Sequence, residues 1–187
     1  VSHFDINSKV KIVYVGSLTD TKNQIALLKV LNSCNIEAEI IFLGDGVNKQ
    51  SLIDYSKKVV PSIKISFKGC LPRNTAIEHM LEADVFISLS KGEGLPIAVL
   101  EAMYCGCFLS LSTIPPHKEV SPPSDRCIYV DKDNEEEIIN SLNYVAKEIC
   151  KLKDQRDMSK DHSLERFGLN NMLEGYMEVY KSVNLDR

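Results

Sequence analysis

Two glutamates with seven residues between them, Glu93 and Glu101, are the side chains of this sequence best suited to bind a polar ligand. Glu93 lies between two glycines, and Glu101 lies in an apolar run that is typical of a helix. A carboxylate can accept hydrogen bonds from two neighbouring hydroxyl groups, such as those of a ribose, through its two oxygens. The alternative for Glu101 is a solvent-exposed helical position, which is the commoner place for a glutamate.

The proline at position 96 decides where the helix that carries Glu101 begins. Ser90 and Glu93 have the spacing of a capping box, which would place Glu93 in the first turn of a helix. In that register Pro96 would lie in the helix interior, where proline costs about 3 kcal/mol or more. Because proline is favoured at the first helical position, we predict a helix over residues 96–104 and a loop over residues 92–94.

This register leaves two backbone amides available for an anion. Ile97 and Ala98 would lie in the first helical turn, where N–H groups have no acceptor within the helix. The positive end of the helix dipole lies at the same place, so a phosphate group would be stabilised there. Water or a loop oxygen is the alternative acceptor for the two amides.

The elements that must position these residues follow from the alternation of apolar, β-rich segments with amphipathic segments along the chain. Most of the strands are continuous apolar runs, which predicts a parallel sheet covered by helices on both faces. We therefore expect one doubly wound, Rossmann-like α/β domain of about six strands over residues 1–187, with the last helices packed on it. Strands are expected at residues 10–15, 38–43, 63–67, 84–89, 107–111 and 127–130, and helices at residues 23–33, 49–59, 75–82, 96–104, 135–150, 154–163 and 169–183.

Two details of this prediction depend on single residue types. Asn74 is a suitable N-cap for the helix over residues 75–82. Residues 112–125 contain two Pro-Pro pairs, which predict an irregular loop.

Such sheets bind ligands beyond the carboxyl ends of the strands, where the strand order reverses. In the common order, the loops after strands one and four flank that crevice, which places residues 16–22 opposite residues 90–95. Lys22 would then bring a positive charge to the crevice. The alternative for Lys22 is a solvated lysine at a helix start.

The composition excludes several other classes of protein. The net charge of −4 gives no reason to expect nucleic acid as a partner. No apolar run approaches the ~20 residues that span a bilayer, and no signal peptide opens the chain, so we expect a cytoplasmic protein. The cysteines show no metal-binding spacing, and we expect buried thiols of a cytosolic protein at all six positions: Cys34, Cys70, Cys105, Cys107, Cys127 and Cys150.

The segment Asp131-Lys132-Asp133 has the form of a metal-binding Asp-x-Asp motif. It follows a short expected strand and precedes a helix, where aspartates serve as turn and cap residues. We prefer that interpretation, and we expect that no metal is required for function.

Five motifs occur in a fixed order along the chain. Together they resemble the donor-binding, C-terminal half of the group 1 glycosyltransferases (family 4, retaining, GT-B architecture), over residues 10 to 180. A later segment, Ile-Pro-Pro-His-Lys-Glu (114–119), also looks like a loop of that family. The five motifs are Val-Gly-Ser-Leu-Thr-Asp-Thr-Lys-Asn (15–23), Phe-Leu-Gly-Asp-Gly (42–46), Phe-Lys-Gly (67–69), Ala-Asp-Val-Phe-Ile-Ser-Leu-Ser-Lys-Gly-Glu-Gly-Leu-Pro (83–96) and Leu-Glu-Ala-Met (100–103).

The resemblance implies a role for each matching position. Glu101 would hold the ribose hydroxyls of a nucleotide, Glu93 would contact the donor sugar, and Lys22 would neutralise the leaving diphosphate. The loop over residues 69–73 would lie along the base. The remaining donor-binding positions implied by the family are Gly16 and Ser17 after the first strand, Leu71 and Arg73 in the base loop, and Gly94, Leu95, Pro96, Ile97 and Ala98 for the sugar and the diphosphate.

One position departs from the family pattern. The family usually has arginine directly after the first-strand glycine, and this chain has Ser17. A hydrogen bond from a charged group contributes about 1.5–3 kcal/mol. Lys22 and the helix amides could suffice without it, Arg73 or Lys91 could replace it, or the domain could be weakly active.

The function implied by the resemblance is sugar transfer from a UDP- or GDP-linked donor to a glycan or lipid-linked acceptor, with retention of anomeric configuration. The family's enzymes also need an N-terminal acceptor domain, so we expect this chain to be the donor domain of a longer enzyme and inactive in transfer alone. Peripheral association of the full enzyme with the inner face of the membrane is compatible with such acceptors.

Three other functions are alternatives to sugar transfer. A non-catalytic nucleotide-binding or regulatory module is favoured by Ser17. An NAD-binding Rossmann domain would need Gly-x-Gly-x-x-Gly after the first strand, where residues 16–21 contain one glycine. A GT-B epimerase or phosphorylase would need different residues over 90–101.

Overall fold

The computed structural model describes residues 9–120 and 124–156, which form a six-stranded, all-parallel sheet with helices on both faces. The strand order is β3-β2-β1-β4-β5-β6. The chain therefore moves outward from β1 in one direction and then returns to build β4, β5 and β6 on the other side, which confirms the predicted doubly wound topology. The strands are β1 (Val10–Val15), β2 (Ala38–Leu43), β3 (Ile63–Gly69), β4 (Val85–Ser88), β5 (Phe108–Ser112) and β6 (Cys127–Val130).

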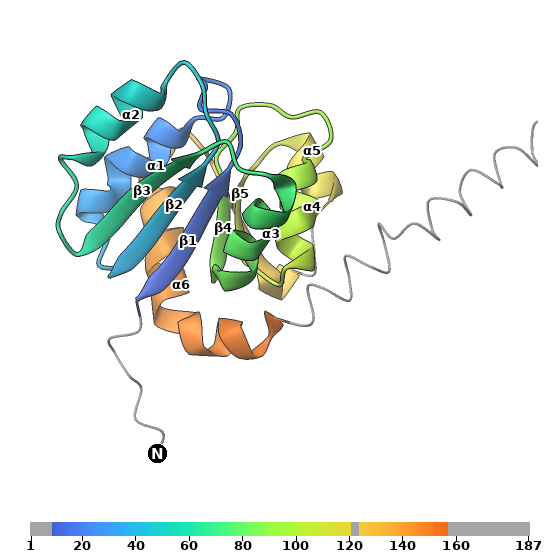
Figure 1. The fold of residues 1–187 in the computed structure, drawn as a ribbon. Helices are drawn as coiled ribbons and strands as arrows, with labels where there is room; N and C mark the ends of the chain where they lie inside the picture. Colours follow the sequence, from blue (N-terminus) through green and yellow to red (C-terminus); the bar gives the residue numbers. More distant parts are fainter. Residues whose placement is uncertain (1–8, 121–123, 157–187) are drawn as a thin grey trace, which may run out of the picture.

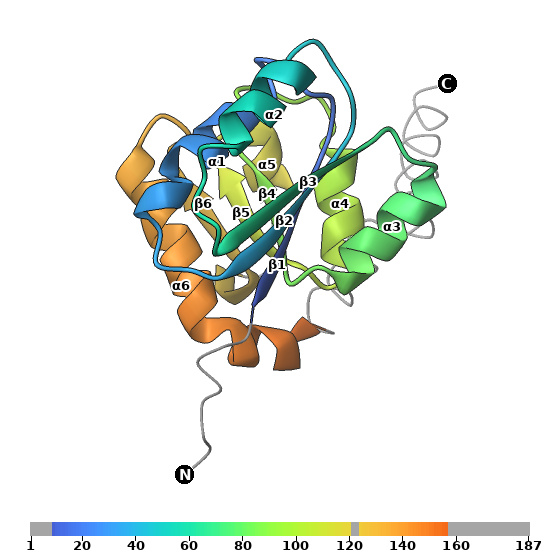
Figure 2. The same cartoon turned by 60° about the vertical axis from the view of Figure 1, so that its left-hand side comes forward.

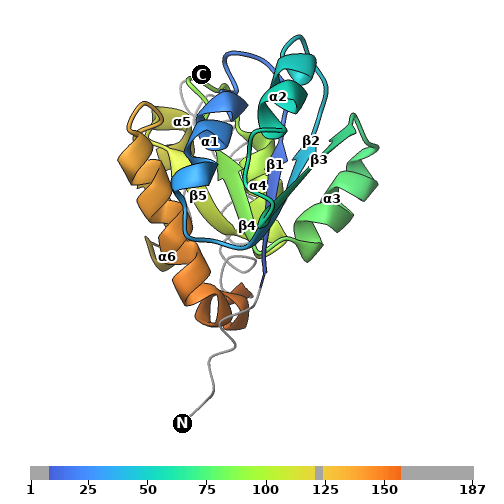
Figure 3. The same ribbon diagram turned by 90° about the vertical axis from the view of Figure 1, so that its left-hand side faces the viewer.

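The helices form two layers (Figure 1). One face of the sheet is covered by α1, α2 and α6, and the other by α3 and α4, as the views in Figures 2 and 3 confirm. The helices are α1 (Gln24–Val30), α2 (Lys49–Ser56), α3 (Arg73–Glu82), α4 (Ile97–Tyr104), α5 (Pro115–Glu119) and α6 (Glu135–Asp154), with short 3₁₀ turns at Leu31–Ser33 and Ser124–Arg126.

The core consists of two apolar clusters, one on each face of the sheet. Alternate residues of β1 point to opposite faces, so Ile12 packs with α1, α2 and α6, whereas Val13 packs with α3 and α4. The central strand β4 is buried along its whole length. Burial on both faces explains why the strands read as continuous apolar runs.

Several predicted element boundaries were wrong. Residues 112–125 were expected to be irregular, but Pro115 and Pro116 occupy the first positions of the short helix α5, where a missing N–H costs nothing. Asn74 is not an N-cap, because α3 begins at Arg73 and Pro72 occupies the cap position. The strands β1, β2 and β6 have the predicted ranges, and the remaining elements differ at their ends by up to a few residues.

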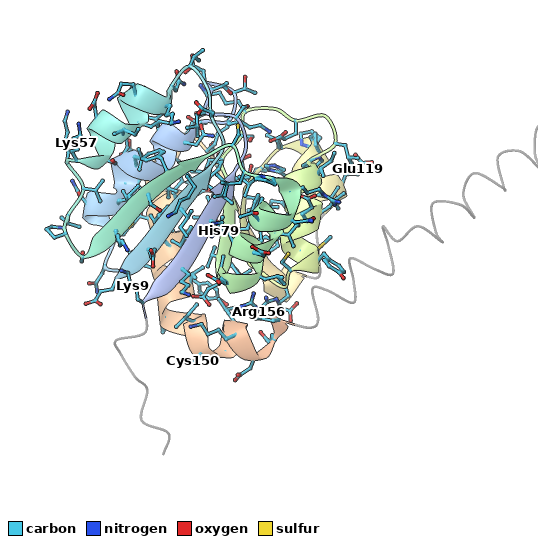
Figure 4. The ribbon with its side chains drawn as sticks, in the orientation of Figure 1. Lys9, Lys57, His79, Glu119, Cys150 and Arg156 are labelled. Atoms are coloured by element: carbon cyan, nitrogen blue, oxygen red, sulfur yellow. The ribbon has the colours of Figure 1, made fainter. Side chains whose placement is uncertain are left out.

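The end of α6 differs from the prediction more substantially. A helix ending at Cys150 was expected, but α6 continues through Asp154. Just beyond it, the Arg156 guanidinium donates to the carbonyl of Leu81 at the end of α3, at 2.7 Å. Figure 4 shows Lys9, Cys150 and Arg156 along the rim where the strands begin.

The helices expected over residues 154–163 and 169–183 lie almost entirely outside the described residues. None of the helices that the structure describes combines the length and apolar character needed to cross a membrane.

Candidate functional site

Three loops meet at the carboxyl edge of the sheet, the rim opposite that formed by Lys9 and Arg156. They are the connections β1–α1, β3–α3 and β4–α4, which Figure 2 shows on the same side of the molecule. Because β1 and β4 are neighbours in the sheet, the first and third of these loops face each other. The predicted crevice therefore lies where the strand order reverses.

A close backbone approach fixes the start of the β1–α1 loop. Gly44, after β2, has a φ of +142°, and a Cβ built there would lie 2.0 Å from the carbonyl oxygen of Gly16. The amide of Gly44 also donates to the carbonyl of Gly69 at 2.8 Å. Glycines therefore follow or end three adjacent strands, and the one at position 44 is required by contact with backbone.

The start of α4 agrees closely with the prediction from Pro96. Pro96 is buried in the cap position, one residue before α4 begins at Ile97, and residues 92–94 form a loop. One detail was wrong: the Ile97 amide donates to the carbonyl of Leu95 at 2.9 Å and so is already bonded. The Ala98 amide has no acceptor among the residues that the structure describes, and it remains suited to an anion.

Lys22 and Glu93 form an ion pair across the crevice. Lys22 Nζ lies 2.6 Å from both carboxylate oxygens of Glu93. The side chains are 25% and 10% exposed, so the pair is only partly screened by solvent. The alternative of a solvated Lys22 is excluded in this structure, and the two predicted catalytic residues are in direct contact.

Both members of this ion pair line a small pocket. The cavity has a volume of about 190 Å³ and reaches from the end of β4 to the first turn of α4. Its lining contains six of the predicted donor-binding residues, together with residues of β1 and β4. The lining residues are Val15, Lys22, Phe86, Ser88, Glu93, Leu95, Pro96, Ile97, Ala98 and Val99.

Glu101 lies one turn further along α4 and is also paired. Its Oε1 accepts a hydrogen bond from Arg73 Nε at 2.6 Å. The Glu101 side chain is only 16% exposed, whereas that of Arg73 is 78% exposed. Glu101 is therefore not a solvated helical glutamate. Arg73, at the start of α3, therefore pairs with the carboxylate that the sequence predicts to bind ribose.

Six predicted site residues are not among the residues that line this pocket: Gly16, Ser17, Leu71, Arg73, Gly94 and Glu101. Ser17 is exposed, and its carbonyl accepts from Gln24 Nε2 at 2.9 Å, on the side of the loop that faces α1. Leu71 packs against the apolar cluster beneath α3 and α4. Lys91 lines a separate hollow with residues of α1 and α2. Neither Lys91 nor Arg73 is among the residues that line the pocket of Lys22 and Glu93.

Sequence reasoning missed a buried polar cluster beneath the β4–α4 loop. His117 of α5 is fully buried, and its Nδ1 lies 3.0 Å from the Ser112 carbonyl oxygen. The Ser112 hydroxyl donates to the carbonyl of Ser90 at 2.6 Å, and Ser88 Oγ lies 3.2 Å from Ser90 Oγ. The feature of the sequence that could have indicated this cluster is a serine near the carboxyl end of each of two adjacent apolar strands.

The environment of His117 favours its neutral form. Burial lowers the pKa of this imidazole below its usual value of 6.5, and the hydrogen bond to the Ser112 backbone opposes that shift. A neutral ring can accept at one nitrogen and donate at the other. The cluster therefore supports the first residues of the β4–α4 loop without adding charge beneath the pocket.

The segment after β6 has the geometry of a turn and a helix cap. Asp131 Oδ1 accepts from the Asp133 amide at 3.0 Å. The Asn134 side chain accepts from the amides of Glu136 and Glu137 at the start of α6. Asp131 is therefore a turn residue, as predicted, whereas the helix cap is Asn134 rather than an aspartate.

The prediction that all six cysteines are buried was wrong for three of them. Cys105, Cys107 and Cys127 are buried, whereas Cys70 and Cys150 are exposed and Cys34 is half-buried. Burial raises the pKa of the Cys107 and Cys127 thiols to about 12, so these two remain protonated at neutral pH.

Solved structures with this arrangement are known. Sucrose-phosphate synthase from Thermosynechococcus elongatus superimposes with a TM-score of 0.82 at 12% identity, over 98% of this chain and 47% of its own. Anabaena HepE in complex with UDP gives 0.80 at 17% identity, over 95% and 50%. The catalytic domain of the Helicobacter pylori cholesterol-α-glucosyltransferase gives 0.73 at 17%, over 84% and 99%.

The sequence comparisons identify the family. Residues 3–162 match the family model of the glycosyl transferases group 1. The Staphylococcus aureus capsular polysaccharide biosynthesis glycosyltransferase CapH is 28% identical over 182 residues, 92% of this chain and 48% of CapH. The putative teichuronic acid biosynthesis glycosyltransferase TuaC of Bacillus subtilis is 31% identical over 91 residues, 49% of this chain and 21% of TuaC.

The fold is thus the doubly wound α/β domain that forms one half of a GT-B enzyme. The chain belongs to the group 1 glycosyltransferase family. It spans less than half the length of the two curated relatives described above.

Proposed function

We propose that this chain binds a nucleotide-diphosphate sugar, linked to UDP or GDP, as the donor half of a retaining hexosyltransferase. The observation that carries the proposal is one pocket at the strand-order reversal that joins Glu93, Lys22 and the unpaired amide of Ala98. HepE, a structure with the same fold, is described in complex with UDP and with UDP-glucose. The acceptor in our proposal is a glycan or a lipid-linked glycan, which the names of CapH and TuaC support.

Each residue has a distinct role in the proposed reaction. Glu101 accepts hydrogen bonds from the ribose hydroxyls through both carboxylate oxygens, and Arg73 must then release Oε1. The Ala98 amide and Lys22 stabilise the diphosphate, and Lys22 turns from Glu93 toward it. Glu93, freed from Lys22, accepts hydrogen bonds from the hydroxyls of the donor sugar.

The chemical step is dissociative. The bond from the anomeric carbon to the diphosphate oxygen breaks, with an oxocarbenium-like transition state, and the diphosphate leaves with the electron pair. Lys22 and the helix amide offset the charge that develops on the leaving oxygen. The acceptor hydroxyl then bonds to the anomeric carbon on the face that the diphosphate has left, and this retains the anomeric configuration. Its proton is transferred to the departing diphosphate oxygen.

Calorimetric titration of UDP and GDP into the 187-residue chain tests the donor site. We expect one of the two nucleotides to bind, and Glu101→Gln to lower its affinity about 10- to 150-fold, because hydrogen bonds to a charged group contribute about 1.5–3 kcal/mol. Glu82→Gln, an exposed helical glutamate at the opposite end of α3, is the matched control. Equal affinity in wild type and Glu101→Gln would rule out the ribose role.

A second function is favoured by one observation. Ser17 replaces the arginine usual in the family, and Lys22 is the one basic side chain among the described residues that line the pocket. In that function the domain binds nucleotide without catalysis. Nucleotide affinity combined with neither donor hydrolysis nor transfer in the full-length protein would favour it, whereas transfer with retained anomeric configuration, read by NMR of the product, supports the enzyme.

A further inference from the structure

Tyr14 is a buried tyrosine whose hydroxyl lies between the two loops of the proposed donor site. It belongs to the central strand β1, is 1% exposed, and stacks on Phe42 with ring centroids 5.7 Å apart. Its hydroxyl donates to the carbonyl oxygen of Lys22 and accepts from the amide of Leu89 at 2.9 Å. One side-chain oxygen thus joins the backbone of the lysine loop to the backbone just after β4.

Asn23 makes a second bond between the same loops. Its side-chain amide donates to the carbonyl of Leu89 at 3.2 Å, so both backbone groups of Leu89 are bonded to the β1 side. Asn23 has a φ of 55°, the one positive value among the described residues other than glycine. The amide of Lys91 also donates to the carbonyl of Thr21, at 2.8 Å. Residues that flank Lys22 therefore hold the start of the loop that carries Glu93.

The Tyr14 hydroxyl has no packing role that would explain its presence. A phenylalanine would fill the same space, and a buried hydroxyl is costly unless it is hydrogen-bonded. Burial raises the pKa of Tyr14 above its usual value, so the phenol stays protonated and keeps its donor. At 1% exposure it cannot touch a ligand. What the hydroxyl adds to the protein is its hydrogen bonds, and two of these join the two loops.

We propose that Tyr14 and Asn23 are positioning residues that hold the Lys22 loop against the Glu93 loop, so that Lys22 Nζ faces the diphosphate site. This inference rests on the proposed function above. Neither residue contacts α4 near Glu101 through the hydrogen bonds described here. We call these hydrogen bonds of Tyr14 and Asn23 the clamp. The clamp therefore affects binding of the phosphates of a ligand and leaves binding of its nucleoside part unaffected.

The selective effect on phosphate binding distinguishes a positioning role from a general effect on stability, which would weaken binding of the diphosphate and the nucleoside alike. UDP and GDP, and separately uridine and guanosine, are titrated into the 187-residue chain and followed by NMR. We expect Tyr14→Phe to weaken binding of the diphosphate about 3- to 10-fold, the effect of one or two hydrogen bonds, and to leave nucleoside binding unchanged. The matched control is Tyr129→Phe, which loses a side-chain bond to the His117 carbonyl on a different strand, and should bind both ligands as the wild type does.

A double-mutant comparison tests the link to the lysine. In a Lys22→Ala background, Tyr14→Phe should cause no further loss of diphosphate affinity, because the group that it positions is absent. If Tyr14→Phe does not fold, Asn23→Gly gives the same test, since glycine keeps the left-handed backbone and removes only the bond to Leu89.

The outcomes are distinguishable. Unchanged diphosphate binding, an equal loss of diphosphate and nucleoside binding, or a full additional loss in the Lys22→Ala background would each overturn the clamp. A wild-type chain that binds neither UDP nor GDP would overturn the proposed function itself.

Discussion

At the scale of single residues, both carboxylates of the site are bonded to a cation in the structure. Glu93 binds Lys22, and Glu101 binds Arg73. In the proposed function, a diphosphate must therefore compete with Glu93 for the lysine, and a ribose must compete with Arg73 for Glu101. Under the same proposal, the ion pairs compensate the charges of the site before a donor binds, at the expense of some binding free energy.

The competition predicts an opposite effect of one substitution on two measurements. Glu93→Gln removes the anion that holds Lys22, so UDP or GDP should bind about 2- to 5-fold more tightly, as expected for a partly exposed ion pair of up to ~1 kcal/mol. Sugar transfer by the full-length enzyme should fall, because the donor sugar loses a contact. Calorimetry and a transfer assay measure the two effects, and weaker nucleotide binding by Glu93→Gln would contradict the competition.

Gly44 is the residue at which a single methyl group should be most disruptive near the site. Its φ of +142° and the 2.0 Å separation between a Cβ placed there and the Gly16 carbonyl oxygen both oppose a side chain. Gly44→Ala should therefore lower the free energy of unfolding by at least about 1–3 kcal/mol, measured by urea denaturation. Gly92→Ala is the control, since no atom lies within 4 Å of its Cβ position. Equal stability of the two variants would refute this account.

At the scale of elements, the β4–α4 loop contains a glycine that the folded protein itself does not need. A Cβ at Gly94 would meet no atom within 4 Å, and Gly94 has no left-handed φ. If this glycine instead allows close approach of a donor, Gly94→Ala should leave the unfolding free energy within about 0.5 kcal/mol of wild type while weakening binding of UDP or GDP. Denaturation and calorimetry on one protein sample measure both, and a variant that binds as the wild type does would remove Gly94 from the site.

The α5 helix should make stability depend on pH through His117. Burial lowers the pKa of His117 in the folded protein, so below pH 6.5 the unfolded chain takes up a proton that the folded protein does not. The contribution is present above that pH and is lost as the pH falls, with a slope of at most about 1.4 kcal/mol per pH unit. Urea denaturation between pH 5 and 8 should show this slope, and His117→Gln should reduce it. His79→Gln removes a histidine outside the cluster, and an equal reduction in that variant would contradict the assignment.

At the scale of the whole molecule, the sequence predicted what depends on periodicity and on proline. Apolar runs predicted the six strands and their parallel order, and Pro96 predicted the start of α4 to within one residue. Individual long-range contacts could not be predicted from the sequence: the Lys22–Glu93 pair, for example, joins residues 71 positions apart. The bond of the Ile97 amide to Leu95 and the helical conformation of Pro115 depend on local backbone geometry that residue types alone leave open.

The arrangement of the site also predicts what the isolated chain cannot do. The described pocket lies on one edge of the sheet, and a dissociative transfer needs water excluded from the donor and an acceptor hydroxyl placed beside the anomeric carbon. In the relatives, more than half of the chain lies outside the matched region. We therefore expect the 187-residue chain to bind UDP or GDP and to transfer no sugar, whereas the full-length protein transfers it. Incubation of both with UDP- and GDP-sugars and a lipid-linked acceptor, with products separated by chromatography, measures this difference. Appreciable transfer by the isolated chain would refute the division of labour between the two halves.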